Sequence, residues 1–436
     1  MPAVESDHMA SDARPKAPPP VRTALSPYSL WLDLSLAARN ILRQRRRSAF
    51  GLGAIAMGVV ALLLAGGFFE WNFEGMREAT IRARIGHVQV MKPGYLDAGA
   101  ADPFGYLIPE KSPEIDRIQS APGVVTVAPR LSFSGLISIG ESTVGFLAEG
   151  VDPIKERVLS GELKILQGEG LSGPDAMEVI VGRGLAENLR LAPGQQVVLL
   201  VTTRAGSPNA VEVKVKGVFR TVTKAYDDYA IRLPIRTAQA LLKAEGAHMA
   251  LVLLDSTSRT DGFIARLQPG LGKNLQMVPW YQTPAADFYN KTVTLFSSQV
   301  AVLKFLIGVI IVLSISNTMM NNVRERIAEI GTCMALGDRR RTVLRRFLVE
   351  GALLGLLGGV VGLAAGVGLA HLISWIGIPM PPPPGMTTGY LAGITVTEPL
   401  ALSALGLAVS TAFLAGIYPA WRASRMAIVD ALRHSR

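Results

Sequence analysis

The sequence predicts a membrane protein with four transmembrane α-helices and a large external mixed α/β domain inserted between the first and second helices. Four segments are long and apolar enough to cross a bilayer of about 30 Å, which takes roughly 20 helical residues. Of the 436 residues, 49% are apolar and 18% are charged, whereas ordinary globular domains carry about 25% charged residues. The arginines cluster beside the apolar segments, as expected for loops at a membrane surface.

The net charge of +10 does not indicate nucleic-acid binding, because no separate basic domain with interleaved aromatic residues accompanies it. Cys333 is the single cysteine of the chain. The sequence therefore contains no intrachain disulfide framework and no cysteine-based metal site.

The N-terminal part divides into a tail, a short helix and the first span. Residues 1–28 have little to bury, and we expect a disordered cytoplasmic tail. Residues 29–47 predict an amphipathic helix on the inner membrane surface; the alternative is a plain extension of the first span. The apolar positions of this helix are Trp31, Leu34, Ala38, Ile41 and Leu42. Residues 48–69 form an apolar run longer than that of a cleaved signal peptide, which indicates an uncleaved signal anchor.

The other three spans are predicted at residues 300–320, 348–376 and 400–419. Arginines precede the first span, fill the 321–347 loop and follow the last span in residues 420–436, while the 377–399 loop has neither lysine nor arginine. Because positive residues mark cytoplasmic segments, both termini and the 321–347 loop are predicted to be cytoplasmic. Residues 70–299 and the short 377–399 loop are then external.

The external region alternates strand-like and helix-like pieces. The predicted strands are "HVQVM", "EVIVG", "QQVVLLV", "VEVKVKGVF" and "MALVLL". The predicted helices are "SPEIDRIQSA" and "LPIRTAQALLKAEG". Both flanks, residues 70–85 and 284–299, are predicted to continue the neighbouring spans as helical stalks. The region is therefore a mixed α/β domain on stalks.

Motifs for catalysis are absent from the sequence. It has no G-x-x-x-x-G-K-[ST], G-x-S-x-G or H-E-x-x-H motif, and its histidines lack metal-ligand spacing. His87 is interpreted as an ordinary polar strand position, and Asp227 with Asp228 as a solvated turn. We do not expect an enzyme, a metal site or a nucleotide bound by this chain alone.

Two ionisable residues and a row of glycines lie in the predicted spans. Lys304 and Glu350 are candidates for functional sites, because charges are costly in a bilayer; a packing or interface role is favoured over a proton relay. Small residues spaced four apart let helices approach closely, against neighbouring helices or a second protomer. These helix-packing glycines are Gly351, Gly355, Gly358, Gly359, Gly362 and Gly366.

The stretch 321–359, "NNVRERIAEIGTCMALGDRRRTVLRRFLVEGALLGLLGG", resembles the FtsX-like/MacB-type permease superfamily, the membrane subunits of ABC transporters of the mechanotransmission kind. The closing "YPAWRASRMAIVDALR" is also similar, although Ile428 stands where the family usually has proline. "GHVQVMKPG" is similar to the lipoprotein-releasing branch. The resemblance covers nearly the whole chain after residue 30.

The resemblance implies that residues 321–347 form a coupling loop, whose helix docks in a groove of a separate ATPase subunit. Ile327, Ile330 and Met334 fall at helical spacing, so we expect one apolar face to enter that groove. Gly337 is suited to ending the helix. The residues expected to couple to the ATPase are Arg326, Ile327, Glu329, Ile330, Gly331, Met334 and Gly337.

The resemblance further implies a bacterial inner-membrane permease that couples cytoplasmic ATP hydrolysis to movement of the external domain, which expels or extracts a lipoprotein, lipid, drug or peptide. ATP and Mg²⁺ would belong to the partner ATPase, with no cofactor bound by this chain. Further partners would be a second permease copy or paralogue, membrane lipid and a periplasmic protein. The alternative is a signalling scaffold that transmits force to a periplasmic partner without transport.

Overall fold

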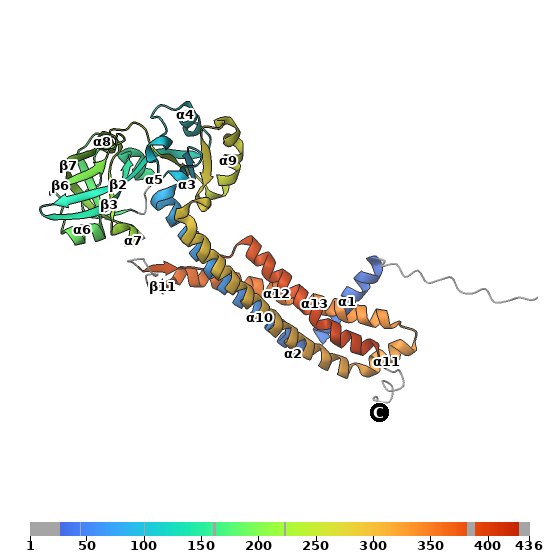
Figure 1. The fold of residues 1–436 in the computed structure, drawn as a ribbon. Coiled ribbons are helices and arrows are strands. Elements are labelled where there is room, and N and C mark those ends of the chain that lie inside the picture. Colours follow the sequence, from blue (N-terminus) through green and yellow to red (C-terminus); the bar gives the residue numbers. More distant parts are fainter. Residues whose placement is uncertain are drawn as a thin grey trace, which may run out of the picture. The chain divides into compact units, whose positions relative to one another are not determined.

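The computed structural model describes residues 27–43, 45–99, 101–159, 163–221, 224–381 and 389–426. It forms two compact units, and Figure 1 shows their elements. The first unit extends to Ala56 and adds Gly308–Val361 and the stretch from Gly406 onward, while Met57–Ile307 and Gly362–Leu405 form the second. The predicted tail before residue 27 and the C-terminal residues beyond 426 lie outside the described residues.

Four helices in the described part of the chain are long and apolar enough to cross a membrane. They are α2 (Arg45–Thr80), α10 (Asp287–Glu325), α12 (Arg340–Ile376) and α13 (Glu398–Ser424). Each predicted span lies within one of them. Helix α2 continues well past residue 69 and α10 begins well before residue 300, so both predicted stalks are helical. Helix α1 (Pro27–Arg43) precedes them and ends at Arg43.

A ten-stranded mixed sheet forms the domain inserted between α2 and α10, in the order β10-β1-β9-β2-β3-β8-β5-β7-β4, with β6 paired to β2 and β7. The strands are β1 (Val88–Met91), β2 (Val124–Ile139), β3 (Ser142–Val151), β4 (Lys164–Gly168), β5 (Glu178–Gly182), β6 (Gln196–Thr202), β7 (Pro208–Arg220), β8 (Ala230–Pro234), β9 (Met249–Leu254) and β10 (Gln276–Pro279). The five predicted strands correspond to β1, β5, β6, β7 and β9.

Two apolar cores lie along this one sheet. The larger core joins β2, β3, β5, β6 and β7 to α6 (Arg183–Leu189) and α8 (Ile235–Leu242), with Leu131, Leu199 and Leu241 fully buried. The smaller core joins β1, β9 and β10 to α4 (Pro113–Gln119) and α9 (Thr260–Leu267). Figure 1 shows α4 and α9 at one end of the sheet and α6 toward the other. Helices α4 and α8 match the two predicted helices.

A buried ion cluster fastens the middle of the sheet. Arg130 on β2 lies 2.9 Å from Glu149 on β3 and 2.6 Å from Glu156 on α5 (Pro153–Leu159). Arg232 on β8 contacts the same two carboxylates, at 3.1 and 2.9 Å. Removing one partner of a buried, hydrogen-bonded ion pair is strongly destabilising, because the other charge then stays buried without a partner. The cluster therefore ties three strands and a helix together.

Short elements connect the sheet to its flanks. After α2 the chain forms a π-helical turn, Ile81–Ile85, and then enters β1. Helices α3 (Tyr95–Ala98) and α7 (Lys224–Asp227) lie in loops of the inserted domain. Within the predicted 377–399 loop, β11 (Ile378–Met380) pairs with β12 (Tyr390–Ala392). That hairpin is held to α2 by Tyr390, which stacks on Trp71 and donates a hydrogen bond to Asn72 at 2.6 Å.

Two polar residues differ from their predicted settings. His87 is buried, and its Nδ1 accepts a hydrogen bond from the Leu254 backbone at 3.0 Å, so it is more than an ordinary strand position. Asp227 was predicted to lie in a solvated turn, and this is wrong. Its carboxylate is 2% exposed and accepts hydrogen bonds from the backbone and hydroxyl of Thr221. A buried acid with such partners fixes the local chain path.

Candidate functional site

The segment between α10 and α12 forms a short helix bounded by two irregular residues. Helix α10 ends at Glu325, and Arg326 leaves helical geometry with φ −102° and ψ 15°. Helix α11 (Ile327–Ala335) follows and has nine residues. Because the backbone of Arg326 departs from helical angles, α11 is a separate helix and does not prolong α10.

Gly337 ends this helix in a Schellman motif. Its φ is +110°, in a region that side chains with a Cβ rarely adopt. The Gly337 amide donates to the Met334 carbonyl at 3.2 Å, and the Asp338 amide donates to the Cys333 carbonyl at 3.0 Å. These two hydrogen bonds satisfy carbonyls that the helix end leaves free. The sequence prediction that Gly337 ends the helix agrees with this geometry.

One face of α11 is buried against the chain's own helices. Ile330 and Met334 are 7% and 8% exposed, and they pack with Val323 on α10, Phe347 on α12 and Ala420 on α13. Gly331 is buried as well. We expected Ile330 and Met334 to enter a groove of a partner, and the structure differs on this point. The sequence showed an amphipathic helix, but it did not show which surface covers its apolar face.

The opposite face of α11 is open. Thr332 and Leu336 are exposed and Ala328 is half-buried, so residues at i, i+4 and i+8 form one stripe. Leu336 is 84% exposed and stands at the helix end, beside the Gly337 turn. Leu336 was not predicted from the sequence. The signal that could have found it is a large apolar residue directly before a helix-ending glycine, where side chains protrude.

Charged residues connect α11 to its neighbours. The Arg326 guanidinium lies 3.1 Å from Glu329 on α11 and 3.5 Å from Glu350 on α12. Asn322 on α10 donates a hydrogen bond to Glu350 at 2.8 Å. Glu350, predicted to have a packing or interface role, is 5% exposed and thus held by two polar partners. Arg326 is placed to fix the bend between α10 and α11.

Helix α1 adds a second set of ion pairs. Asp33 is 2% exposed and lies 2.6 Å from Arg345 and 3.6 Å from Arg346, near the start of α12. Arg346 also contacts Asp338, in the turn after α11, at 2.7 Å. Of the predicted apolar stripe, Ile41 is buried within this unit while Trp31 is 68% exposed. Asp33 was not singled out from the sequence, since a lone acid on an amphipathic helix gives no signal of its own.

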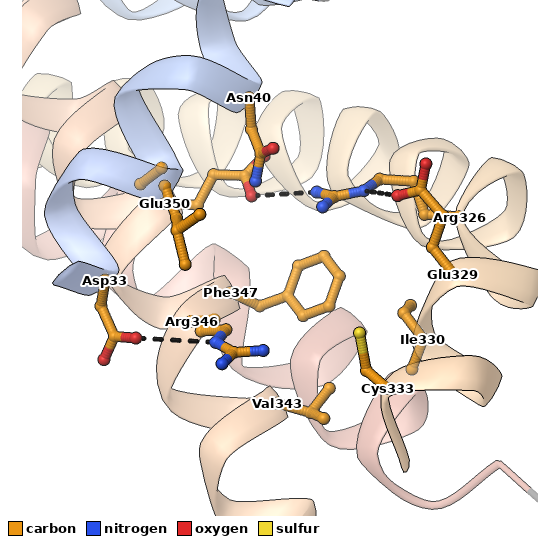
Figure 2. A pocket seen from close by; sticks show the side chains of 12 residues that line it. Asp33, Asn40, Arg326, Glu329, Ile330, Cys333, Val343, Arg346, Phe347 and Glu350 are labelled. Atoms are coloured by element: carbon orange, nitrogen blue, oxygen red, sulfur yellow. Dashed lines mark hydrogen bonds and ion pairs between the residues drawn. The ribbon is translucent and has the colours of Figure 1, made fainter. Parts of the chain in front are cut away.

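A cavity of about 200 Å³ lies between α1, α11 and α12, and Figure 2 shows the side chains around it. Its lining combines these ion pairs with apolar groups. The lining residues are Asp33, Leu36, Ala37, Asn40, Arg326, Glu329, Ile330, Cys333, Val343, Arg346, Phe347 and Glu350. Acids and arginines face one another across it, so its charges are largely matched. Among the described residues no group of histidine, cysteine and acid is arranged to hold a metal ion.

The predicted glycine ridges contact other helices of the same chain. All of these glycines are buried. A Cβ at Gly355 would lie 2.7 Å from the Ala412 methyl and 2.9 Å from the Ala408 carbonyl, on α13. A Cβ at Gly358 would lie 2.8 Å from Ile55, on α2. The facing alanines, Ala408 and Ala412, are completely buried and were missed by the sequence analysis.

Lys304 is not among the residues that line this cavity. It lies on α10 within the second unit and is half-buried. The arrangement described here is therefore built from the residues around α11, with Glu350 as the one predicted intramembrane charge that belongs to it.

Comparisons with known proteins agree with this architecture. The model of the FtsX-like permease C-terminal domain matches residues 301–428. The model of the MacB-like periplasmic core domain matches residues 48–269, which is more than half of the chain.

Individual relatives cover different shares of the chain. A permease of Methanocaldococcus jannaschii, named as an uncharacterized ABC transporter permease, is 24% identical over 92% of this chain and 97% of its own length. The macrolide export ATP-binding/permease protein MacB of Syntrophobacter fumaroxidans is 26% identical over 68% of this chain and 42% of its own length. The chain thus spans about two fifths of that MacB relative.

Among solved structures, the periplasmic region of MacB from Actinobacillus actinomycetemcomitans matches 48% of this chain and 94% of its own length, at 15% identity and a TM-score of 0.34. The extracellular domain of the transporter YknZ matches 44% of this chain and 98% of its own length, at 16% identity and a TM-score of 0.33. On the matches to the two family models, the chain belongs to the FtsX-like and MacB-type ABC transporter permeases.

Proposed function

We propose that this chain is a permease subunit that couples ATP hydrolysis on a separate cytoplasmic subunit to movement of its inserted domain. The membrane would be the bacterial inner membrane, with both termini and α11 in the cytoplasm and the inserted domain outside. The arginine asymmetry of the loops supports this orientation. Family membership implies an ATPase partner.

The observation that carries the proposal is the two-sided character of α11. Ile330 and Met334 anchor one face in the chain's own core, and the stripe through Ala328, Thr332 and Leu336 faces away from it. A helix that docks in a partner's groove needs an exposed apolar side chain, which Leu336 supplies. A helix that transmits movement must also be fixed to the rest of its own chain, and the buried face of α11 fixes it.

Continuous helices support the transmission of such movement. Helix α10 runs from Asp287 to Glu325 without interruption, immediately before Arg326 and α11. In the second unit, Glu78 of α2 accepts a hydrogen bond of 2.6 Å from Thr257, and Thr257 lies 3.0 Å from Nε2 of His87. This chain of contacts fastens the end of α2 to the inserted domain beside β1 and β9.

The remaining parts of the proposal concern partners. ATP and Mg²⁺ would be bound by the ATPase, because this chain has no nucleotide-binding motif. A second permease copy or paralogue would complete the transporter, in contact with membrane lipid. The substrate would be a lipoprotein, lipid, drug or peptide, with a further protein on the external side.

The test is a substitution at Leu336. Leu336→Asp should reduce co-purification with the ATPase by about tenfold or more, because a few central residues carry most of an interface's binding energy. Leu336→Met, which keeps an apolar side chain of similar size, is the matched control. Normal ATPase binding and ATP hydrolysis in Leu336→Asp would remove α11 from the interface.

The buried face gives a contrasting outcome. Met334→Asp would place a charge in the core formed with Val323 and Phe347, which is strongly unfavourable. We therefore expect this variant to lose stability of the first unit even without the ATPase, whereas Leu336→Asp should keep it. Thermal unfolding of the purified chain separates the two.

A further inference from the structure

Part of the inserted sheet exposes apolar side chains to solvent. In β6, Val197, Leu199 and Val201 point into the larger core, while Val198 and Leu200 are 40% and 39% exposed. A sheet with one solvated face usually alternates apolar residues inward with polar residues outward. Val198 and Leu200 break that rule, whereas the outward Gln196 and Thr202 of the same strand follow it.

Strand register gathers more apolar groups at the same place. Leu136 on β2 pairs with Gly145 on β3 and with Leu200 on β6. Leu136 is 43% exposed. Side chains directly opposite each other across neighbouring strands share a face of the sheet. Leu136 and Leu200 therefore stand side by side, with the glycine leaving a gap on the other side.

This gap is the floor of a hollow of about 650 Å³. A Cβ at Gly145 would meet no atom nearer than the Gly135 carbonyl oxygen, at 4.0 Å. Tyr229 is 43% exposed and lines the hollow, and its backbone carbonyl accepts a hydrogen bond from the Leu147 amide at 2.9 Å. The lining residues are Ser134, Gly135, Leu136, Gly145, Phe146, Leu147, Leu200, Val201, Thr202, Pro208 and Tyr229.

The lining determines which ligands fit. None of the lining residues is charged, and their side-chain polar groups are the hydroxyls of Ser134, Thr202 and Tyr229. An ionic group placed there would lose water without gaining a counter-charge. The volume lies in the range of about 300–1,000 Å³ that is typical of small-molecule sites. An uncharged apolar molecule matches this chemistry.

A protein surface matches it less well. Stable protein interfaces bury about 800 Å² on each partner and are surrounded by a polar rim. A Cβ at Gly145 would meet only the Gly135 carbonyl oxygen, at 4.0 Å, and Leu136, Leu147 and Tyr229 are among the residues that line the same hollow. Such a gap admits a narrow chain more readily than the surface of a second copy.

We infer that this hollow is a binding site for an uncharged apolar chain, such as the acyl part of a lipid. The inference goes beyond the proposed coupling function, since it concerns the inserted domain alone and requires neither ATP nor the ATPase. It places on β2, β3 and β6 a site for the lipid class of substrate, and in naming that class it rests on the proposed function.

The test uses the full chain in lipid nanodiscs and a photoreactive probe, a long-chain fatty alcohol with a diazirine in the middle of its chain. Mass spectrometry of the cross-linked peptides should find the probe on β2, β3 or β6. Gly145→Leu should reduce this labelling by about tenfold or more, because the new side chain occupies the hollow. The fold should persist, since the Cβ position is free and Gly145 lies in a regular strand.

Gly262→Leu is the matched control, because a Cβ at Gly262 on α9 also meets no atom within 4 Å and lies outside the hollow. Equal labelling of the two variants, or labelling confined to the membrane spans, would overturn the inference.

A second copy covering this face would also overturn it. Thr143→Cys, two residues before Gly145 on β3, in a Cys333→Ser background would then cross-link efficiently between chains with a bismaleimide. Because no step needs ATP, these outcomes leave the coupling proposal untouched.

Discussion

The carboxylate of Asp33 on α1 lies 2.6 Å from Nε of Arg345 on α12, and the aspartate is 2% exposed. The sequence assigns the arginines of this region to the membrane surface, yet two of them, Arg345 and Arg346, pair with this buried acid. Helix α1 is therefore attached to the base of α12 by an ion pair whose acid is almost fully buried.

Asp33→Asn should loosen α1. The substitution removes the charge that Arg345 and Arg346 share, and both arginines are about one-third exposed, so the expected cost is about 1–2 kcal/mol. Hydrogen exchange of the amides in 31–43 should become about tenfold faster. Arg43→Ala is the control, because its pair with Glu329 is exposed and 4.0 Å long, and such pairs contribute little. Unchanged exchange in Asp33→Asn would show that packing alone holds α1.

Gly355→Leu should disrupt the contact between α12 and α13. A side chain there would meet the Ala408 carbonyl oxygen and the Ala412 methyl at less than 3 Å. Overpacking of this kind costs about 1–3 kcal/mol, and we expect a lower melting temperature in detergent with insertion retained. Gly368→Leu, on the same helix, is the control because a Cβ at Gly368 meets no atom within 4 Å. Similar melting of the two variants would contradict close packing at Gly355.

Single cysteines should report the orientation of the chain. In a Cys333→Ser background, Ser207→Cys in the inserted domain should react with an impermeant maleimide in intact spheroplasts. Thr332→Cys on the exposed face of α11 should react after permeabilisation alone. Both positions are exposed, so the permeabilised sample controls for reactivity. The opposite pattern would invert the proposed topology.

The stability of the inserted domain should fall in mild acid. Burial lowers the pKa of His248 to about 4, although the hydrogen bond with the Pro103 carbonyl acts in the opposite direction. The buried ring is held by that contact at Nε2 and by the Ser132 amide, which donates to Nδ1. The folded state thus disfavours protonation of His248, whereas the histidine of the unfolded chain takes up a proton near pH 6.5. Stability is complete above that pH and should decline by up to about 3 kcal/mol as the pH falls to about 4.

Thermal unfolding of the full chain across this pH range is the measurement for His248. His248→Gln should be less stable at neutral pH, since two hydrogen bonds change, but its stability should depend less on pH between about 6.5 and 4. A wild-type profile that is flat in this window would mean that His248 is already accommodated as a cation.

The sequence predicted the spans, the stalks and half of the sheet for physical reasons. Long apolar runs have few alternatives to a membrane helix, and "EVIVG" and "MALVLL" are strands buried enough to be continuously apolar. Strands β2 and β3 escaped prediction because Pro129, Gly135 and several serines interrupt their apolar pattern. Their pairing is decided by contacts across the sheet, which a local pattern does not contain.

The sequence predicted where the site around α11 lies in the chain, but not which surface its apolar face contacts. Periodicity identified Ile330 and Met334 as one face of a helix, and it is silent on which surface covers that face. The partners Asp33 and Arg345 are far apart in sequence, as are Arg130 and Arg232, so no spacing rule links them. Sequence reasoning therefore finds such residues only when a family motif includes them, as for Arg326, or when a charge falls within a predicted span, as for Glu350.

Strand β2 has a consequence for how the inserted domain moves. Its first part, to Arg130, pairs with β9, and its last part pairs with β6, while β3 follows it from Arg130 to Ile139. The two apolar cores are thus joined by one strand, and the buried ion cluster sits at the junction. Bending there would break ladder hydrogen bonds and expose paired charges together. We therefore expect the domain to move as one rigid body, so that a displacement of β1 is transmitted in full to the hollow above Gly145.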